Sequence, residues 1–274
     1  MSLPLFSRTH AASPLQWILR LAGLGAAWTA FNPPVGAGEV SGRINVLLLL
    51  ADNWAYPHSS FLGDRTVKTP NFDRLAREGV FFRHAFCPVP SCSPTRASIL
   101  TGREPHELGE AVNLWSGLPT TYPSLTQELR RTGYDVGYTG KGWAPGNHVA
   151  SGWSENPVGT RHGSLKEFLD QRSATHPFFF WIGNLDTAIG HWDYDAGATA
   201  DLDPSSVVVP AHLPDLPEVR HDILAYYNGV RKFDRLIGES RDLLERNGLL
   251  ENTVIVCVSD NGWQVPRGLA NCYD

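Results

Sequence analysis

The segment 44–51 (INVLLLLA) constrains the fold most, because it is apolar apart from Asn45 and ends at a polar pair, Asp52-Asn53. A continuous apolar run of this length predicts a central parallel strand buried on both faces. Three further segments predict strands: 134–139, 177–183 and 253–259. The last is another buried run, and it also ends at an Asp-Asn pair, Asp260-Asn261.

Helical segments alternate with these strands. Pro70 and Gly79 bound a short helix over 70–78, and further helices are predicted at 124–132, from Ser164, and over 219–247. Ser164 with Glu167 forms a capping-box pattern, and residues 195–217 read as a long loop rich in Pro, Asp and Ser. This alternation predicts an α/β fold, with a mostly parallel central sheet and helices on both faces. Ligands of such sheets bind beyond the carboxyl ends of the strands, where both Asp-Asn pairs fall.

Composition and charge limit the classes of function. The 274 residues suffice for one large α/β domain or two small ones, and 42% hydrophobic residues predict a sizeable core. A net charge of −5 argues against wrapping nucleic acid, which needs a basic face. An anionic substrate would therefore depend on a few local Arg and Lys residues.

The N-terminus has the pattern of a signal peptide over residues 1–37. It is basic, the apolar stretch 21–31 follows, and Val35 and Ala37 are the small residues of a cleavage site. We expect cleavage near Ala37, export to the periplasm or the medium, and a mature chain of 38–274. An uncleaved anchor is the alternative, but the apolar run is short for a span, and no other stretch predicts one.

The four cysteines are compatible with two disulfides in an exported protein. They are Cys87, Cys92, Cys257 and Cys272. Spacing alone leaves a Cys87–Cys92 bridge open. Cys257 lies inside an apolar run and is interpreted as a buried, inert thiol.

Residues 92–102 (CSPTRASILTG) resemble the sulfatase signature C-x-P-x-R…T-G. Three other segments are similar to sulfatase motifs: 45–52 to the first strand with its metal aspartate, 133–141 (GYDVGYTGK) to the second signature, and 259–262 (SDNG) to the late metal-binding turn. The resemblance covers about residues 43–274 and points to the heparan N-sulfatase branch. It implies hydrolysis of O- or N-sulfate groups on a sulfated sugar or glycosaminoglycan.

The resemblance implies that a formylglycine-generating maturation enzyme oxidises Cys92 to the nucleophile, with Arg96 and Lys141 as catalytic partners. An aldehyde hydrate has one hydroxyl to attack sulfur and a second to release sulfate. Pro94 predicts the first turn of a helix reaching about Leu100. Position 92 would then lie just before the helix N-terminus, where free N–H groups favour anions.

A metal site is implied as well. Its ligands would be Asp52, Asn53, the modified Cys92, Asp260 and Asn261. Such an all-oxygen set favours Ca²⁺, with Mg²⁺ second. Zinc is not indicated, because the sequence has no HExxH motif or Cys/His cluster. Either Asp-Asn pair alone would be interpreted as an ordinary turn.

The match departs from the family at four places. Asn53 stands where a second Asp is usual, which should weaken metal binding. Gly142, Trp143 and Ala144 follow Lys141 where a His is common. The family's Pro-His-Arg run is replaced within 186–191 (DTAIGH), so His191 is a candidate substitute. Arg267 is the basic residue nearest the position expected after the late turn. Lys141, His191 and Arg267 are thus the predicted substrate-binding residues.

Two alternatives stay open. One is a formylglycine-dependent phosphonate or phosphate ester hydrolase, since that chemistry also needs a clamped tetrahedral anion. The other is a catalytically dead relative, because sulfatases continue with a smaller C-terminal subdomain that we expect to be missing after Asp274. The sequence does not distinguish O-sulfate from N-sulfate, and it does not identify the sugar.

Overall fold

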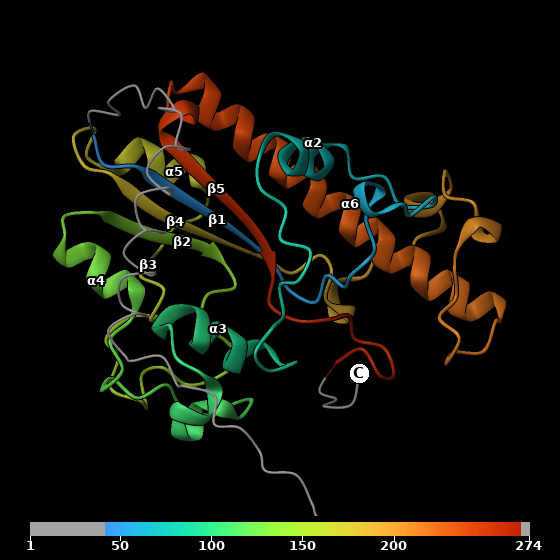
Figure 1. Ribbon diagram of the computed structural model, residues 1–274, viewed down its shortest axis with the longest axis horizontal. Helices are drawn as coiled ribbons and strands as arrows, with labels where there is room; N and C mark the ends of the chain where they lie inside the picture. The colour runs from blue at the N-terminus through green and yellow to red at the C-terminus, as the bar shows by residue number, and fades with distance from the viewer. Residues whose placement is uncertain (1–41, 270–274) are drawn as a thin grey trace, which may run out of the picture. The chain divides into compact units, whose positions relative to one another are not determined.

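The computed structural model describes residues 42–269, so the predicted signal peptide and Cys272 lie outside the described residues. Residues Arg43–Asp274 belong to one compact unit. Its centre is a parallel five-stranded sheet in the order β3-β2-β4-β1-β5 (Figure 1). Within the described range, no helix has the length and apolarity that crossing a membrane requires.

Four of the five strands agree with the predicted segments within one residue. The strands are β1 (Asn45–Ala51), β2 (Asp135–Gly140), β3 (Thr160–Arg161), β4 (Phe178–Asn184) and β5 (Thr253–Ser259). β1 lies between β4 and β5, with Leu48 paired with Trp181 on one side and Val256 on the other. The short strand β3 was not predicted, because two residues carry no periodicity.

The helices are α2 (Pro70–Glu78), α3 (Cys92–Thr101), α4 (Leu125–Arg131), α5 (Leu165–Gln171) and α6 (Pro217–Arg246). Short 3-10 turns are η1 (Ser60–Leu62), η2 (Pro105–Glu107), η3 (Gly109–Val112), η4 (Ile189–His191), η5 (Ala196–Thr199), η6 (Pro204–Ser206) and η7 (Leu250–Asn252). α6 begins two residues before the prediction, with Pro217 in its first turn. The capping box of α5 is half formed: Ser164 accepts from the Glu167 N–H, but the Glu167 carboxylate accepts from Gly163 instead.

Helices cover both faces of the sheet, as predicted, because alternate residues of β1 point to opposite sides. Leu48 and Leu50 pack in one core with Ala97 and Leu100 of α3. Leu47 and Leu49 pack in a second core, which includes Leu165 and Phe168 of α5 and Phe233 and Ile237 of α6. Figure 1 shows α3 and α4 on one side of the strands and α5 and α6 on the other.

The prediction of β5 as a buried strand was wrong for one of its faces. β5 is an edge strand of the described sheet, with Val254 47% and Val256 39% exposed. Its other face packs inward with Ile255 and Cys257. Burial, with a smaller contribution from Asp234, raises the pKa of the Cys257 thiol to about 12, as expected of an inert thiol. Cys87, Cys92 and Cys257 are all free thiols, so no Cys87–Cys92 bridge forms.

A third core lies against the first half of α6 and encloses an imidazole. The ring of His58 lies 4.5 Å from that of Trp263 and 5.4 Å from those of Tyr226 and Tyr227. Burial lowers the pKa of His58 to about 4, against a smaller opposing effect of Asp64. The folded protein therefore holds this histidine neutral.

Acid should destabilise the protein through His58. Between its unfolded pKa of 6.5 and its folded pKa of about 4, the unfolded chain binds the proton and the folded chain does not, so stability falls with pH in that window. From pH 7.5 to 5 the wild type should lose about 2 kcal/mol more unfolding free energy than His58→Phe. Urea titrations at both pH values measure this difference. An equal loss in the two proteins would show that His58 is not held neutral.

Candidate active site

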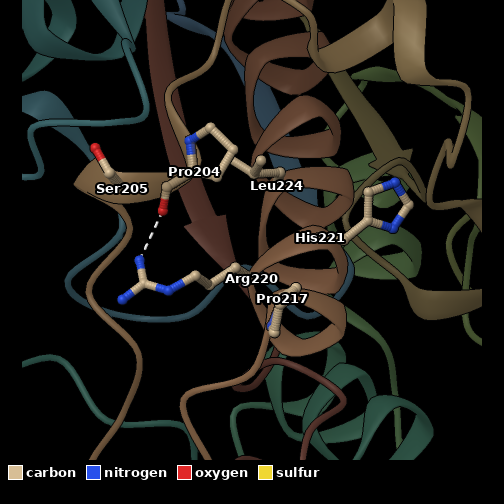
Figure 2. A pocket seen from close by; sticks show the side chains of 6 residues that line it. All are labelled: Pro204, Ser205, Pro217, Arg220, His221 and Leu224. Carbon is tan, nitrogen blue, oxygen red and sulfur yellow. Dashed lines mark hydrogen bonds between the residues drawn. The ribbon is translucent and has the colours of Figure 1, made fainter.

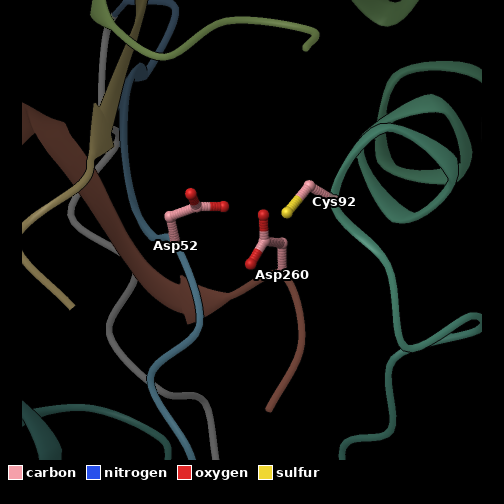
Figure 3. Close-up of side chains that lie close together, drawn as sticks. All are labelled: Asp52, Cys92 and Asp260. Atoms are coloured by element: carbon pink, nitrogen blue, oxygen red, sulfur yellow. The ribbon is translucent and has the colours of Figure 1, made fainter. Parts of the chain in front are cut away.

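Three strand ends bring polar side chains together at one edge of the sheet. Asp52 and Asn53 follow β1, Lys141 follows β2, and Asp260 and Asn261 follow β5. The backbone N–H of Asp52 donates to Asn184 O and that of Asp260 donates to Ala51 O, so the sheet ladder continues into these residues. In Figure 3 the side chains of Asp52, Asp260 and Cys92 point toward one another.

Cys92 enters this group from the start of α3. The prediction placed it just before the helix, but it is the first helical residue, with the extended Ser91 at the N-cap. The first-turn N–H groups of a helix have no intrahelical partner and favour negative charge. Cys92 is buried, and its Sγ lies 3.8 Å from Asn53 Oδ1 and 3.7 Å from Asn261 Nδ2.

Arg96, one turn along α3, is fully buried and joins the two carboxylates. Its Nε donates to Asp260 Oδ2 at 2.8 Å, and its Nη2 donates to Asp52 Oδ1 at 3.3 Å. Its Nη1 donates to the carbonyls of Lys141 and Gly142 at 2.8 and 2.9 Å. The guanidinium thus fixes the ends of β1, β2 and β5 together.

Lys141 is the more accessible cation of the site, with 13% of its side chain exposed against 0% for Arg96. Its Nζ lies 2.8 Å from both carboxylate oxygens of Asp52. Glycine is required beside it: a Cβ on Gly183 would lie 1.8 Å from Lys141 O, and Gly140 has a positive φ of 72°. The tight β2–β4 approach therefore positions Lys141.

The charges of the cluster balance, because two carboxylates face one guanidinium and one ammonium. Burial raises the pKa of Asp260 to about 6; Arg96 opposes this shift and Asp52 adds to it. Burial alone would raise the pKa of Asp52. The hydrogen bond with Asp260 and the charges of Arg96 and Lys141 together outweigh burial, so the pKa of Asp52 is lowered. Burial, Asp260 and Asp52 raise the pKa of Cys92 to about 11. An unmodified Cys92 is therefore a neutral thiol at pH 7, not a thiolate nucleophile.

The donor set fits a hard divalent cation. Asp52, Cys92 and Asp260 offer atoms that all lie within 4.8 Å of one another. Asn261 Oδ1 is buried and has no hydrogen-bond partner in the described part of the chain. A buried acceptor without a partner is costly unless a cation or water satisfies it. Beside two buried carboxylates, this oxygen suits a cation such as Ca²⁺ or Mg²⁺.

The structure brings together seven of the nine predicted site residues. They are Asp52, Asn53, Cys92, Arg96, Lys141, Asp260 and Asn261. His191 and Arg267 do not join this buried cluster: both are exposed, His191 at the end of η4 and Arg267 on the loop after β5. Sequence reasoning missed Thr187, whose Oγ1 donates to Asp52 O at 2.6 Å, and Gln264, which binds Asn53. No local pattern marks either residue, because their roles depend on loops meeting in space.

A separate surface pocket lies at the start of α6. Figure 2 shows its lining residues, which are Pro204, Ser205, Pro217, Arg220, His221 and Leu224. Arg220 is already bound to the Asp215 carboxylate and to the carbonyls of Pro204 and Val207. The arginine stabilises the loop before α6, and the pocket is not part of the cluster.

Comparison with known proteins supports the resemblance. The family model described as Sulfatase matches residues 44–154 and 162–271. The chain is 30% identical over 271 residues to the N-sulphoglucosamine sulphohydrolase of Homo sapiens, covering 84% of this chain and 52% of that protein. It is 28% identical over 307 residues to the N-acetylgalactosamine-6-sulfatase of Canis lupus familiaris, covering 89% and 53%.

Solved structures share the fold. The putative sulfatase yidJ from Bacteroides fragilis superposes with a TM-score of 0.66 at 20% identity, over 83% of this chain and 64% of that one. The chain spans about half the length of the curated relatives it matches.

Proposed function

Since the chain belongs to the sulfatase family, we propose that it hydrolyses sulfate esters or N-sulfate groups on a sulfated sugar or glycosaminoglycan. The observation that carries the proposal is the convergence of Cys92, at the start of α3, with the buried Asp52 and Asp260. The two relatives are named for an N-sulfated and a 6-sulfated amino sugar, so both classes of substrate are candidates.

Cys92 is the proposed nucleophile after oxidation to formylglycine by a maturation enzyme. One hydroxyl of the formylglycine hydrate would attack sulfur and displace the sugar alcohol or amine, which leaves with a proton. Deprotonation of the second hydroxyl would then restore the aldehyde and release sulfate. The neutral state of the Cys92 thiol supports this modification, because the unmodified side chain is a poor nucleophile here. The free N–H groups at the start of α3 would stabilise the negative charge that develops beside position 92.

Asp52, Asn53, Asp260 and Asn261, with the modified residue 92, would hold the cation, for which we propose Ca²⁺ before Mg²⁺. A cation held there would supply positive charge that stabilises negative charge developing at the site. Arg96 holds Asp52 and Asp260 in place. The ammonium group of Lys141 is proposed to contact the substrate sulfate, since its side chain is partly exposed. We propose His191 and Arg267 as further substrate contacts at the protein surface. We also propose that the signal peptide directs export of the protein.

The activity is tested with protein produced together with a formylglycine-generating enzyme. Defined saccharides carrying only O-sulfate or only N-sulfate, and a matched phosphate ester, are incubated in parallel. The proposal predicts release of sulfate and little release of phosphate. Preferential release of phosphate would support the ester-hydrolase alternative. Absence of both, in protein whose residue 92 is converted, would support a catalytically dead relative.

Restoring a charge at position 53 should strengthen cation binding. Chelation is expected to remove activity, and Ca²⁺ should restore it better than Zn²⁺. Asn53→Asp should tighten Ca²⁺ binding by about tenfold, because a carboxylate is a stronger ligand of a hard cation than an amide. Isothermal titration of the metal-free protein measures this. Unchanged or weaker affinity would indicate that Asn53 is not a ligand.

Replacing the exposed Arg267 tests whether this residue contacts the substrate or is only part of a surface loop. If it clamps sulfate, Arg267→Ala should cost about 1.5–3 kcal/mol in transition-state binding, the usual contribution of a charge-assisted hydrogen bond. Arg267→Lys should recover only part, since lysine lacks the two-pronged geometry. The measurement is kcat/KM on a sulfated sugar, with Lys141→Ala beside it. If kcat/KM falls strongly in Lys141→Ala and is unchanged in Arg267→Ala, the loop after β5 has no catalytic role through Arg267.

A further inference from the structure

Gln264 lies on the loop after β5 and connects two other strand-end loops. Its side-chain Oε1 accepts a hydrogen bond from Asn53 Nδ2 at 2.8 Å and another from the backbone N–H of Ile189 at 2.8 Å. A carbonyl oxygen has two lone pairs, so both acceptor positions are used. The residue therefore ties the turn after β1 to η4.

This contact determines which end of the Asn53 amide faces Cys92. With Nδ2 held by Gln264, the Oδ1 of Asn53 points the other way and lies 3.8 Å from Cys92 Sγ. The Asn53 backbone is fixed too: its φ is 73°, a left-handed value that asparagine tolerates, and its N–H donates to Asp260 Oδ1 at 3.1 Å. Rotation of the amide about its last side-chain torsion would exchange Oδ1 and Nδ2 in this buried position.

The Gln264 side chain extends from a loop that is anchored on both sides. Trp263 before it is buried, with its ring against that of His58. Pro266 after it accepts a hydrogen bond through its carbonyl from His212 Nε2 at 2.9 Å. A glutamine held in this way can impose an orientation on its partner instead of adapting to it.

We propose that Gln264 is a positioning residue, which turns the Asn53 amide so that its oxygen faces the cation site. This inference rests on the proposed metal-dependent function. A neutral amide presents one acceptor and one donor, and only the oxygen can ligate a cation. A carboxylate at position 53 would need no such orientation, because both of its oxygens accept.

The test compares the effect of Gln264→Met in two proteins, one that keeps Asn53 and one that carries Asn53→Asp. Ca²⁺ affinity is measured by titration calorimetry in the wild type, Gln264→Met, Asn53→Asp and the double variant. Gln264→Met should raise Kd about tenfold when residue 53 is Asn, the usual effect of losing a ligand-orienting partner, and less than about twofold when it is Asp. Gln264→Glu is the matched control: it keeps both acceptors, and its Kd should stay within about threefold of wild type. An equal loss in both backgrounds would overturn the proposal, because it would mean that Gln264 only anchors the loops.

A readout without metal separates this inference from the proposed function. In the calcium-free full chain, the NMR signals of the Asn53 side-chain amide should show a hydrogen-bonded, slowly exchanging NH₂ group. They should lose that protection in Gln264→Met and keep it in Gln264→Glu. If the Asn53 amide signals are equally protected in the wild type and in Gln264→Met, the proposal is overturned. Protected signals in a protein that binds Ca²⁺ in neither background would instead overturn the cation site and leave the Asn53 orientation standing.

Discussion

Cys92→Ala is expected to fold and to lose sulfatase activity by several orders of magnitude, as when a covalent nucleophile is removed. The side chain lies where the start of α3 meets Asp52 and Asp260, so its removal takes the proposed nucleophile out of the cluster. The measurement is kcat/KM on a sulfated saccharide, with circular dichroism to verify the fold. Cys92→Ser should also be inactive unless the host converts serine.

Cys87→Ala is the matched control for this experiment. Cys87 is a free, exposed thiol five positions before Cys92 in the sequence, and it is not a member of the Asp52–Cys92–Asp260 group. Its removal should leave kcat/KM close to wild type. Near-normal turnover by Cys92→Ala would contradict the assigned nucleophile, whatever the behaviour of the control.

Arg96→Met should produce the largest loss of stability. It leaves the buried carboxylates of Asp52 and Asp260 without the guanidinium that joins them, and it removes the donor that the Gly142 carbonyl shares with that of Lys141, which keeps the Trp181 indole N–H. Breaking a buried ion pair on one side costs about 3–5 kcal/mol. Urea denaturation measures the unfolding free energy. Arg130→Met is the control: Arg130 and Glu155 form a pair more than a third exposed, worth about 1 kcal/mol or less.

The pH dependence of Arg96→Met gives a second check. Without the guanidinium, the folded pKa of Asp260, already above the unfolded value, should rise further, and the lowered pKa of Asp52 should rise as well. A carboxylate with a raised folded pKa destabilises the protein as pH rises from the unfolded value through the folded one. The deficit of the variant should therefore be smaller at pH 5 than at pH 8. A deficit below about 1 kcal/mol at both values, the usual worth of an exposed pair, would show that Arg96 is not the clamp described here.

Much of the site could be predicted from sequence because it lies where local patterns end. The apolar run before Asp52 and the strand before Asp260 each terminate in a polar pair, and parallel strands deliver their ends to one edge. Cys92 was predictable from the extended signature that follows it. Lys141 was predictable from the second signature, and Gly140 and Gly183 explain structurally why it reaches the site.

What could not be predicted depends on packing between distant segments. The role of Arg96 is one example: the resemblance implied a catalytic partner of residue 92, whereas the buried side chain donates to two carboxylates and two carbonyls. Gln264 is another, since its partner Asn53 is 211 positions away. The exposure of Val254 and Val256 depends on which strands lie beside β5, and the apolar pattern carries no information about that.

The most direct test of the account is mass spectrometry of the peptide that carries residue 92, from protein produced with a formylglycine-generating enzyme. We expect an aldehyde in place of the Cys92 thiol, and specific activity on a sulfated saccharide that rises in proportion to the converted fraction. Hydrolysis at full rate by protein whose Cys92 remains an unmodified thiol would contradict it.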